Sequence, residues 1–561
     1  MFGNSIIVNG IVEGDIKYKN IVCRNHMINK FQQDKLFAET DRYIILLDGV
    51  ILNQRDLLEK QDKTCWQDTI LRFYEQRGER FFDILRGSFA GALYDKQQDK
   101  WIIFGDQIGS KFVYYAKIGD FFCCSEVMGN MYELLRENKK NYHLNETGAF
   151  LLLTYGYMVD DITLCEEVHK INPGCYITYQ NGKVEEHRYY MLSNQPDESI
   201  LEDDAVELID KYFRQAVVRE FEKDKEYGYQ HLVALSGGLD CRMTSFVAHN
   251  CGYEKQLNMT FSQTGYWDQT LPMKMAADMK HEWIYKALDN GMWLYDVDEI
   301  TRTNAGNVLY YGNAHGNSLL KYINFKKLGA EHTGQIGDVI LSSFITAADK
   351  EKRYKIGQKA YSEKFIDKLG NLKLGLDLDK EMGLFYYRAF NGTNNGIQCD
   401  YNYTEVLSPF LDIDLMEKAL SIPIELREKH KIYIKWILAK YPQAAKYVWQ
   451  TTGEKITRKP LKIGNKEIPW SKIPQSIKWH LRSAFGLSNE GTDSLNHMNP
   501  IAYYLKHNTE LMEYLNGYFN YIEAIPNEDI RKIVVDIQKT GKAMEKIEAV
   551  SLLAAVKMFY I

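Results

Sequence analysis

The sequence lacks the features that mark several protein classes. It has no run of about 18 apolar residues, so we expect no transmembrane helix. Lysine and arginine total 69 against 75 acidic residues, a formal charge of −6, and this balance argues against a nucleic-acid-binding surface. Residues 1–10 contain no basic segment followed by an apolar core, so no signal peptide is predicted.

The cysteines are arranged in no recognisable framework. None of the nine belongs to a Cys-x-x-Cys pair, which argues against a zinc site and against a disulfide scaffold. We interpret them as buried thiols and expect a cytoplasmic protein. They are Cys23, Cys65, Cys123, Cys124, Cys165, Cys175, Cys241, Cys251 and Cys399.

What is present indicates a large globular chain. Its 561 residues are 45% hydrophobic and 26% charged, which is typical of folded proteins and too long for one ordinary core. An acidic, polar stretch at residues 193–204 separates two patterns. We therefore predict one domain at residues 1–192 and a second at residues 200–561, the latter with a helical C-terminal part.

The first pattern is rich in strands. Residues 43–47 and 50–52 are apolar runs on either side of Asp48-Gly49, a dipeptide typical of a hairpin turn. Further strands are predicted at residues 87–94, 101–104, 111–115 and 121–124. A helix should begin near Thr64 and end at Gly78. Closely spaced strands with few helices predict an α+β sandwich of packed antiparallel sheets.

The second pattern is helical, with short apolar runs between the helices. Val206, Ile209, Phe213 and Val217 share one face of a long predicted helix. The alternation of helices and short strands predicts an α/β domain with a parallel sheet.

The most informative segment covers residues 231–250. A strand at 232–235 runs into the turn Ser236-Gly237-Gly238, and a helix follows. This junction directs backbone N–H groups and the positive end of the helix dipole at one point, which binds anions. Asp240 beside a phosphate requires an intervening cation, so the segment predicts Mg²⁺ as well as a phosphate ligand. A Gly-Gly turn alone also occurs without a ligand, and the longer Ser-Gly-Gly-x-Asp string favours the phosphate loop.

Several segments, in one order, resemble a known family. The loop at Ser236 resembles the Ser-Gly-Gly-x-Asp-Ser loop of the ATP pyrophosphatases. The other segments are similar to those of the asparagine synthetase family, and they are Tyr155-Gly-Tyr157, Lys170-Ile-Asn-Pro-Gly174, Gly334-Gln-Ile-Gly-Asp338, Ser408-Pro-Phe-Leu-Asp412 and His430-Lys-Ile-Tyr-Ile-Lys-Trp436. Together they cover most of residues 40–450.

The resemblance implies two coupled activities. An N-terminal nucleophile-like amidotransferase domain would release ammonia from glutamine. An adenine nucleotide α-hydrolase-like domain would adenylate a carboxylate, release pyrophosphate and transfer the acyl group to ammonia, as in the biosynthesis of an amino acid. ATP and Mg²⁺ are the implied cofactors.

The resemblance also assigns the site residues. Asp240 and Asp338 are the implied metal ligands, and Lys431, Lys435 and Gln335 are the implied catalytic groups. The implied ATP-binding residues are Leu235, Ser236, Gly237, Gly238, Asp240, Cys241 and Gly334. Lys431 and Lys435 also fit a simpler interpretation, a pair of solvated lysines one helical turn apart. Asp268 is expected only to support the nucleotide pocket.

The sequence departs from the family at both sites. Phe2 replaces the nucleophilic cysteine that follows the initiator methionine, and a phenyl ring cannot attack an amide. The family's Asn-Gly-Glu triplet reads Asp48-Gly49-Val50. Cys241 replaces a serine, Gln335 a glutamate and Ile336 a glycine. We therefore expect the N-terminal half to be an inactive, structural amidotransferase domain.

These observations predict an AMP-forming carbon–nitrogen ligase. Three alternatives remain open: a non-catalytic protein that kept the fold, a ligase for a sugar acid or peptide carboxylate rather than aspartate, and activation of a tRNA base, which the acidic charge disfavours. The expected partners are a small-molecule carboxylate and amine, with neither nucleic acid nor membrane. A separate ammonia source and a homodimer are compatible with the sequence.

Overall fold

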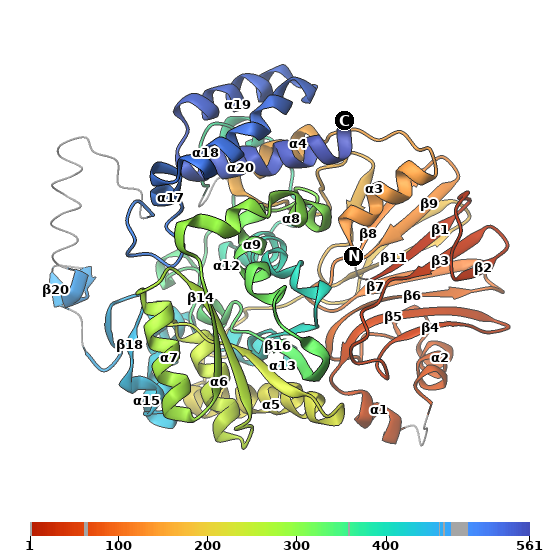
Figure 1. The fold of residues 1–561 in the computed structure, drawn as a ribbon. Coiled ribbons are helices and arrows are strands. Elements are labelled where there is room, and N and C mark those ends of the chain that lie inside the picture. The colour runs from red at the N-terminus through yellow and green to blue at the C-terminus, as the bar shows by residue number, and fades with distance from the viewer. Residues whose placement is uncertain (1–2, 61–64, 357–359, 459–460, 464–465, 473–491) are drawn as a thin grey trace.

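The structure is a computed structural model that describes residues 3–60, 65–356, 360–458, 461–463, 466–472 and 492–561. Its N-terminal half holds antiparallel sheets and its C-terminal half a parallel sheet (Figure 1). Among the described residues, no helix combines the length and the apolarity needed to cross a membrane.

The N-terminal half is built from two six-stranded sheets, ordered β10-β8-β9-β1-β3-β2 and β12-β11-β7-β6-β5-β4. The strands are β1 (Asn4–Val8), β2 (Ile16–Tyr18), β3 (Ile21–Asn25), β4 (Leu36–Glu39), β5 (Tyr43–Ile51), β6 (Gly87–Asp95), β7 (Lys100–Gly105), β8 (Tyr114–Ile118), β9 (Phe121–Ser125), β10 (Val168–Lys170), β11 (Cys175–Gln180) and β12 (Lys183–Arg188). The helices are α1 (Gln54–Lys60), α2 (Trp66–Arg77), α3 (Met128–Glu137) and α4 (Glu146–Tyr155).

Alternation along these strands produces two apolar faces. Ile44 and Leu46 of β5 face the other sheet, where they join Ile6 and Phe122 in a core between the sheets. Ile45 on the opposite face joins a second core, which includes the apolar side of α2. The packed antiparallel sheets predicted for this half are confirmed.

The predicted hairpin turn at Asp48-Gly49 is wrong. Residues 43–51 form one continuous strand, β5, which pairs with β6 through Asp48↔Ala90 and Gly49↔Phe89. Gly49 has φ 126°, and a Cβ there would lie 2.1 Å from the Ser88 carbonyl oxygen. A dipeptide common in turns is used here where the strand needs a close approach and a positive φ.

The C-terminal half is centred on a five-stranded parallel sheet ordered β15-β14-β13-β16-β17. Its strands are β13 (Gln230–Ala234), β14 (Gln256–Ser262), β15 (Glu282–Ala287), β16 (Leu328–His332) and β17 (Val406–Leu407), followed by the short pairs β18 (Val448–Trp449), β19 (Glu454–Lys455), β20 (Leu461–Ile463) and β21 (Lys466–Ile468). The parallel arrangement predicted for this half is confirmed.

The C-terminal half also contains many helices. They are α5 (Glu202–Glu226), α6 (Asp240–Asn250), α7 (Trp267–Met279), α8 (Val297–Asn304), α9 (Tyr310–Leu320), α10 (Gly337–Ile340), α11 (Ile366–Leu369), α12 (Lys380–Gly383), α13 (Ile413–Leu420), α14 (Ile424–Arg427), α15 (Lys431–Lys440), α17 (Ile501–His507), α18 (Thr509–Asn516), α19 (Glu528–Thr540) and α20 (Ala543–Ala555). The 3₁₀ and π segments are η1 (Gly78–Arg80), η2 (Asp289–Tyr295), η3 (Phe325–Lys327), η4 (Ala347–Asp349), η5 (Leu384–Thr393), η6 (Asn394–Ile397), η7 (Asp400–Asn402), η8 (Pro409–Leu411), η9 (Glu428–His430), η10 (Ala444–Lys446), η11 (Trp470–Lys472), η12 (Gly517–Ala524) and η13 (Val556–Tyr560).

The two halves share one hydrophobic core. In Figure 1 the blue C-terminal helix α20 lies beside α4 of the first half, and the two helices pack together. Near the C-terminus, Phe559 stacks on Tyr132 of α3 with ring centroids 4.2 Å apart. The segment after residue 500 therefore closes the junction between the halves, a role that its sequence did not reveal.

Candidate active site

The Ser-Gly-Gly turn lies at the carboxyl end of β13, the central strand of the parallel sheet. Helix α6 begins at Asp240, and the predicted strand, turn and helix are all present. The Gly238 N–H donates to Ser236 Oγ at 3.2 Å. The turn thus lies at the sheet edge where ligands bind in open α/β folds.

A second loop, residues 334–338, follows the neighbouring strand β16 and packs against the first. A Cβ on Gly334 would lie 2.3 Å from the Cys241 nitrogen, and a Cβ on Gly337 would lie 2.8 Å from Asp240 Cγ. Only glycine allows the two loops to approach so closely. The contact brings Asp240 and Asp338 together.

Asp240 is a half-buried carboxyl group at the start of α6. The Tyr433 hydroxyl donates to its Oδ1 at 2.9 Å. Burial and the charge of Asp338 raise the pKa of Asp240 well above its usual value. Two carboxylates from facing loops are the oxygen ligands that Mg²⁺ prefers, and a divalent cation between them would remove the repulsion. The donor set therefore fits the implied metal.

The first loop has a third carboxylate. Asp268, near the start of α7, accepts the Gly237 N–H at 2.7 Å. Burial raises the pKa of Asp268, although the Gly237 N–H opposes this change. One of the N–H groups available for a phosphate is therefore already used by an acid.

Arg242 stabilises the Ser-Gly-Gly turn through hydrogen bonds to backbone carbonyl groups. Its guanidinium donates to the carbonyl oxygens of Gly237 at 2.8 Å, Val448 at 2.7 Å and Ala444 at 3.2 Å. Burial lowers the pKa of Arg242 to about 10. This arginine lies one residue after Cys241, inside the recognised motif, yet its position on the helix gave no sign that it would turn back toward the loop.

The structure does not bring the two lysines to this site. Lys431 Nζ lies 2.8 Å from Glu428 and donates to the Glu425 carbonyl. Lys435 Nζ lies 2.7 Å from Asp203, an acid at the start of α5. At 3.6 residues per turn, these lysines share one face of α15, and Tyr433 lies on the opposite face. Because Tyr433 contacts Asp240, both ammonium groups point away from it.

Two residues that the sequence reasoning missed lie near the two aspartates. One is Tyr433, the donor to Asp240. The other is His430, whose ring lies 5.2 Å from that of Trp449. Burial lowers the pKa of His430, and the charge of Asp338 opposes this effect. The helical period could have identified Tyr433. If Lys431 and Lys435 share the solvent-facing side of the helix, Tyr433 lies on the opposite side and points inward.

The substituted positions of the two loops have distinct environments. Burial and the neighbouring Asp240 raise the pKa of Cys241 to about 12, so its thiol is protonated near neutral pH. Gln335 Nε2 lies 3.5 Å from the Thr393 carbonyl, and its Oε1 is buried without a hydrogen-bond partner among the described residues. Ile336 adopts φ 55°, a left-handed conformation that a β-branched residue rarely adopts. Leu235 ends the buried strand run, and its N–H donates to the Met259 carbonyl.

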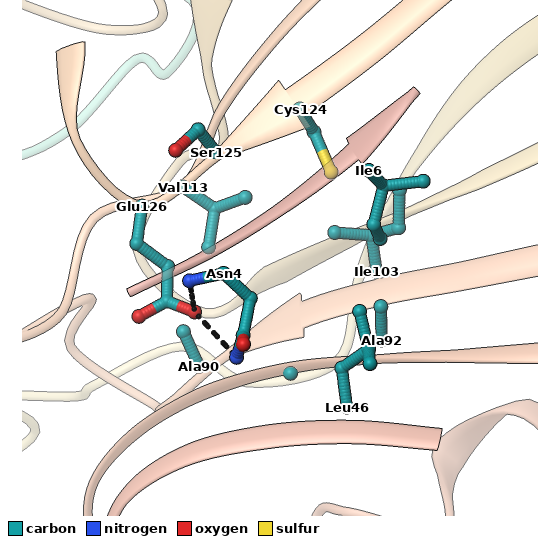
Figure 2. Close-up of a pocket in the computed structure, with 11 residues that line it drawn as sticks. Asn4, Ile6, Leu46, Ala90, Ala92, Ile103, Val113, Cys124, Ser125 and Glu126 are labelled. Carbon is teal, nitrogen blue, oxygen red and sulfur yellow. Dashed lines mark hydrogen bonds between the residues drawn. The ribbon is translucent and has the colours of Figure 1, made fainter. Parts of the chain in front are cut away.

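The N-terminal half shows what occupies the expected glutamine site. Phe2 lies outside the described residues, but Asp48 is buried between Lys35 and Lys111. Figure 2 shows Asn4 directed at Glu126, whose Oε1 accepts from the Asn4 backbone N–H at 3.0 Å and from its Nδ2 at 3.2 Å. The cavity beside them has about 20 Å³, room for one water molecule. This cavity is too small for an amino acid.

Comparison with known proteins relates the chain to amidotransferases. A glutamine amidotransferase domain family matches residues 26–190. Asparagine synthetase B [glutamine-hydrolyzing] of Escherichia coli (strain K12) is 23% identical over 222 residues, which are 38% of this chain and 33% of the relative. The nodule asparagine synthetase of Pisum sativum is 26% identical over 223 residues, 38% of this chain and 31% of the relative. The chain thus matches about a third of the length of these relatives.

One solved structure illustrates the structural comparison. It is a glutamine phosphoribosylpyrophosphate amidotransferase from B. subtilis in complex with ADP and GMP, 9% identical, with a TM-score of 0.23. The similarity covers 50% of this chain and 59% of that one.

Proposed function

We infer, because the chain belongs to the asparagine synthetase family, that it is an ATP-dependent amide ligase. In the proposed reaction a carboxylate oxygen bonds to the α-phosphorus of ATP and pyrophosphate leaves. An amine nitrogen then bonds to the acyl carbon, AMP leaves with the electrons of the C–O bond, and the amine loses a proton. The observation that carries this proposal is the meeting of Asp240 and Asp338 from two adjacent loops.

Each part of the site has a proposed task. The Ser236–Gly238 turn and the start of α6 receive phosphate oxygens, because their N–H groups and the helix dipole favour an anion. Asp240 and Asp338 hold Mg²⁺, which would neutralise the phosphate charge when bound. Tyr433 orients Asp240 through its hydroxyl hydrogen bond. Lys431 and Lys435 must leave their ion pairs with acids before either can contact a phosphate.

The amine is proposed to come from outside this chain. Asp48, in the place of the family's substrate-binding asparagine, is buried in ion pairs and offers no free amide. Gln335 cannot accept a proton near neutral pH, so the attacking amine must arrive neutral or lose its proton to another group. Free ammonia, ammonia from a separate glutaminase, and the amino group of a larger substrate all meet this requirement.

A second candidate function is favoured by one contact. Because the Gly237 N–H donates to Asp268, the loop as it stands presents a carboxylate where a phosphate would approach. A non-catalytic protein that retained the fold would keep this contact. In the ligase, by contrast, Asp268 must release Gly237 or share a cation with the nucleotide. Equilibrium binding of ATP with and without Mg²⁺ separates the two: magnesium-dependent binding supports the ligase, and the absence of any binding supports the second candidate.

Pyrophosphate release tests the ligase directly. The purified chain is incubated with ATP, Mg²⁺ and panels of amino acids, sugar acids and peptides as carboxylates, each with ammonium or a primary amine. We expect release that depends on one class of carboxylate, with one AMP formed per pyrophosphate. Release with none of the panel would contradict the proposal.

Labelled glutamine tests the source of the amine. With glutamine as the only amine, we expect no labelled glutamate from the protein alone. Glutamate formed in a constant ratio to AMP would show that the N-terminal half is active after all. AMP formation that requires a bulkier amine would assign the acceptor to a class other than ammonia.

A further inference from the structure

We propose that a ring of four buried charges between the two halves positions the second loop of the proposed ATP site, with Glu405 as the positioning residue. This inference rests on the proposed function for its catalytic consequence. Three members of the ring, Lys35, Asp48 and Lys111, belong to the N-terminal half, and Glu405 belongs to the C-terminal half.

The ring is closed and electrically neutral. Lys35 Nζ lies 2.8 Å from Asp48 Oδ1 and 2.7 Å from Glu405 Oε1. Lys111 Nζ lies 2.7 Å from Asp48 Oδ2 and 3.0 Å from Glu405 Oε2. None of the four side chains is more than 2% exposed. Each ammonium lies between two carboxylates of the ring, and the buried Glu126 carboxyl group lies beside Asp48, where burial and the charge of Asp48 raise the pKa of Glu126. Removal of Glu405 therefore leaves Lys35 and Lys111 with Asp48 and with an acid that is costly to ionise.

Glu405 is connected to the second loop through a very short strand. It directly precedes β17, a two-residue strand at the edge of the parallel sheet that pairs, among the strands that the structure describes, with β16 alone. The Glu405 carbonyl accepts the Glu331 N–H at 2.8 Å, and the Leu407 carbonyl accepts the Thr333 N–H at 2.8 Å. Two residues provide little pairing of their own, so an anchor at one end has a large effect on the position of the strand.

The strand in turn holds the loop. Ser408 Oγ, one residue past β17, donates to the Gln335 carbonyl at 3.3 Å. A Cβ on Gly337 would lie 2.8 Å from Phe410. The path from the ring to Asp338 therefore consists of Glu405, β17, Ser408 and the loop. Movement of β17 displaces Asp338 relative to Asp240, and small displacements at a catalytic centre reduce turnover strongly.

The location of the ring explains why an inactive amidotransferase half is retained. Asp48 stands where the family places a glutamine-binding residue, and here it has no room for a ligand because Lys35, Lys111 and Glu405 surround it. A second anchor lies close by, since Tyr401 from the same C-terminal segment forms a hydroxyl hydrogen bond with Ser88 at 3.1 Å. The former substrate pocket thus binds the ligase half.

The molecule provides a matched control in Asp34 and Lys223. This second ion pair also joins the halves, with its atoms 2.9 Å apart and both side chains no more than 1% exposed. Lys223 lies on α5, and its other polar contacts are Gln54 and Glu226 rather than β17 or the second loop. Asp34→Asn and Glu405→Gln therefore each remove one buried carboxylate charge from the interface, but only the second touches the proposed path.

The experiment compares Glu405→Gln with Asp34→Asn in the full chain, at a temperature where circular dichroism shows both to be folded. We expect Glu405→Gln to lower kcat for pyrophosphate release at saturating ATP by about tenfold or more, and Asp34→Asn to leave it within about twofold. Lys35→Arg, which keeps the charge, should retain kcat, and Lys35→Met should not. Equal kcat in Glu405→Gln and Asp34→Asn would overturn the proposal.

Hydrogen–deuterium exchange supplies a readout that needs no activity. We expect faster exchange across residues 333–341 in Glu405→Gln than in Asp34→Asn. If the wild-type chain releases no pyrophosphate, the proposed function fails, but this difference in exchange still supports the positioning role, and its absence still overturns it. If Glu405→Gln does not fold, the double variant Lys35→Met/Asp48→Asn leaves one intact pair. Because Lys111 still holds Glu405 in this variant, we expect a smaller increase in exchange across the same residues, and unchanged exchange there counts against the proposal.

Discussion

Two charge clusters in this molecule are built in opposite ways, and only the first is fully buried. At the junction of the halves, Lys35, Asp48, Lys111 and Glu405 cancel one another. At the edge of the parallel sheet, Asp240 and Asp338 come together while the nearby lysines of α15 point elsewhere. A neutral cluster is complete without a ligand, whereas a cluster of one sign needs a cation. This difference is the reason for proposing a structural role for the first cluster and a ligand-binding role for the second.

The largest expected effect comes from removing one acid of the uncompensated cluster. Asp338→Asn should lower turnover by at least about a hundredfold, because the metal loses one of its two anionic ligands. The unfolding midpoint should stay close to the wild-type value, since Asp338 is exposed and the substitution relieves repulsion of Asp240. Initial rates of pyrophosphate release and a thermal melt check both statements. Wild-type turnover in this variant would contradict the metal assignment.

Substitutions in the neutral ring should destabilise the fold more when they leave a net buried charge than when they remove one charge of each sign. Lys35→Met leaves a buried carboxylate in excess and should cost about 3–5 kcal/mol of unfolding free energy. The double variant Lys35→Met/Asp48→Asn removes one charge of each sign and should cost less than the single variant. Denaturant unfolding of wild type, both single variants and the double variant gives the coupling energy. Additive losses would show that the four groups do not act as a ring.

A third cluster, formed by the buried side chains of His332, Glu220 and Asp224, should make the stability of the fold depend on pH. Burial alone would lower the pKa of His332, but the carboxylates of Asp224 and Glu220 raise it to about 9. A raised histidine pKa stabilises the fold fully below the unfolded value of 6.5 and loses that contribution as pH rises through 9. The shift corresponds to about 3 kcal/mol.

The measurement is denaturant unfolding at pH 7 and pH 9 for wild type and His332→Gln. Wild type should lose stability over this interval, and the variant should show a flatter dependence. The ring at Glu405 contributes nothing here, because its ammonium pKa values are raised and its Asp48 pKa is lowered, away from this window. An equally steep loss in His332→Gln would assign the pH dependence to other groups.

The smallest effect is expected at Cys241. Its thiol has a pKa raised to about 12 and therefore acts only as a weak neutral donor beside the loop. Cys241→Ser should keep turnover within about tenfold of wild type, equivalent to ~1.4 kcal/mol in the barrier. The same pyrophosphate assay measures it. A greater loss would show that sulfur has a role of its own.

The sequence predicted the strand-turn-helix at Ser236 because strand, glycines and helix are consecutive and local geometry decides their form. Asp338 was placed with Asp240 only by resemblance, since 98 positions separate them in the numbering. The hairpin at Asp48-Gly49 failed because tertiary pairing with β6 outweighed the preference of the dipeptide for turns. Glu405 gave no signal at all, because its partners Lys35 and Lys111 are known only once the halves meet.

The ring also has a consequence for how the chain is made. Glu405 leaves the ribosome long after Lys111, by about 15–60 s at usual rates of about 5–20 residues per second. Until then Lys35 and Lys111 lack one of the two carboxylates that lie against them in the ring, and Glu126, the other acid nearby, is costly to ionise. We therefore expect this part of the N-terminal half to pack incompletely by itself. During synthesis the first half therefore awaits the second, and a ribosome-bound chain halted before residue 405 should be cut by protease near Lys35 and Lys111, where the finished protein is resistant.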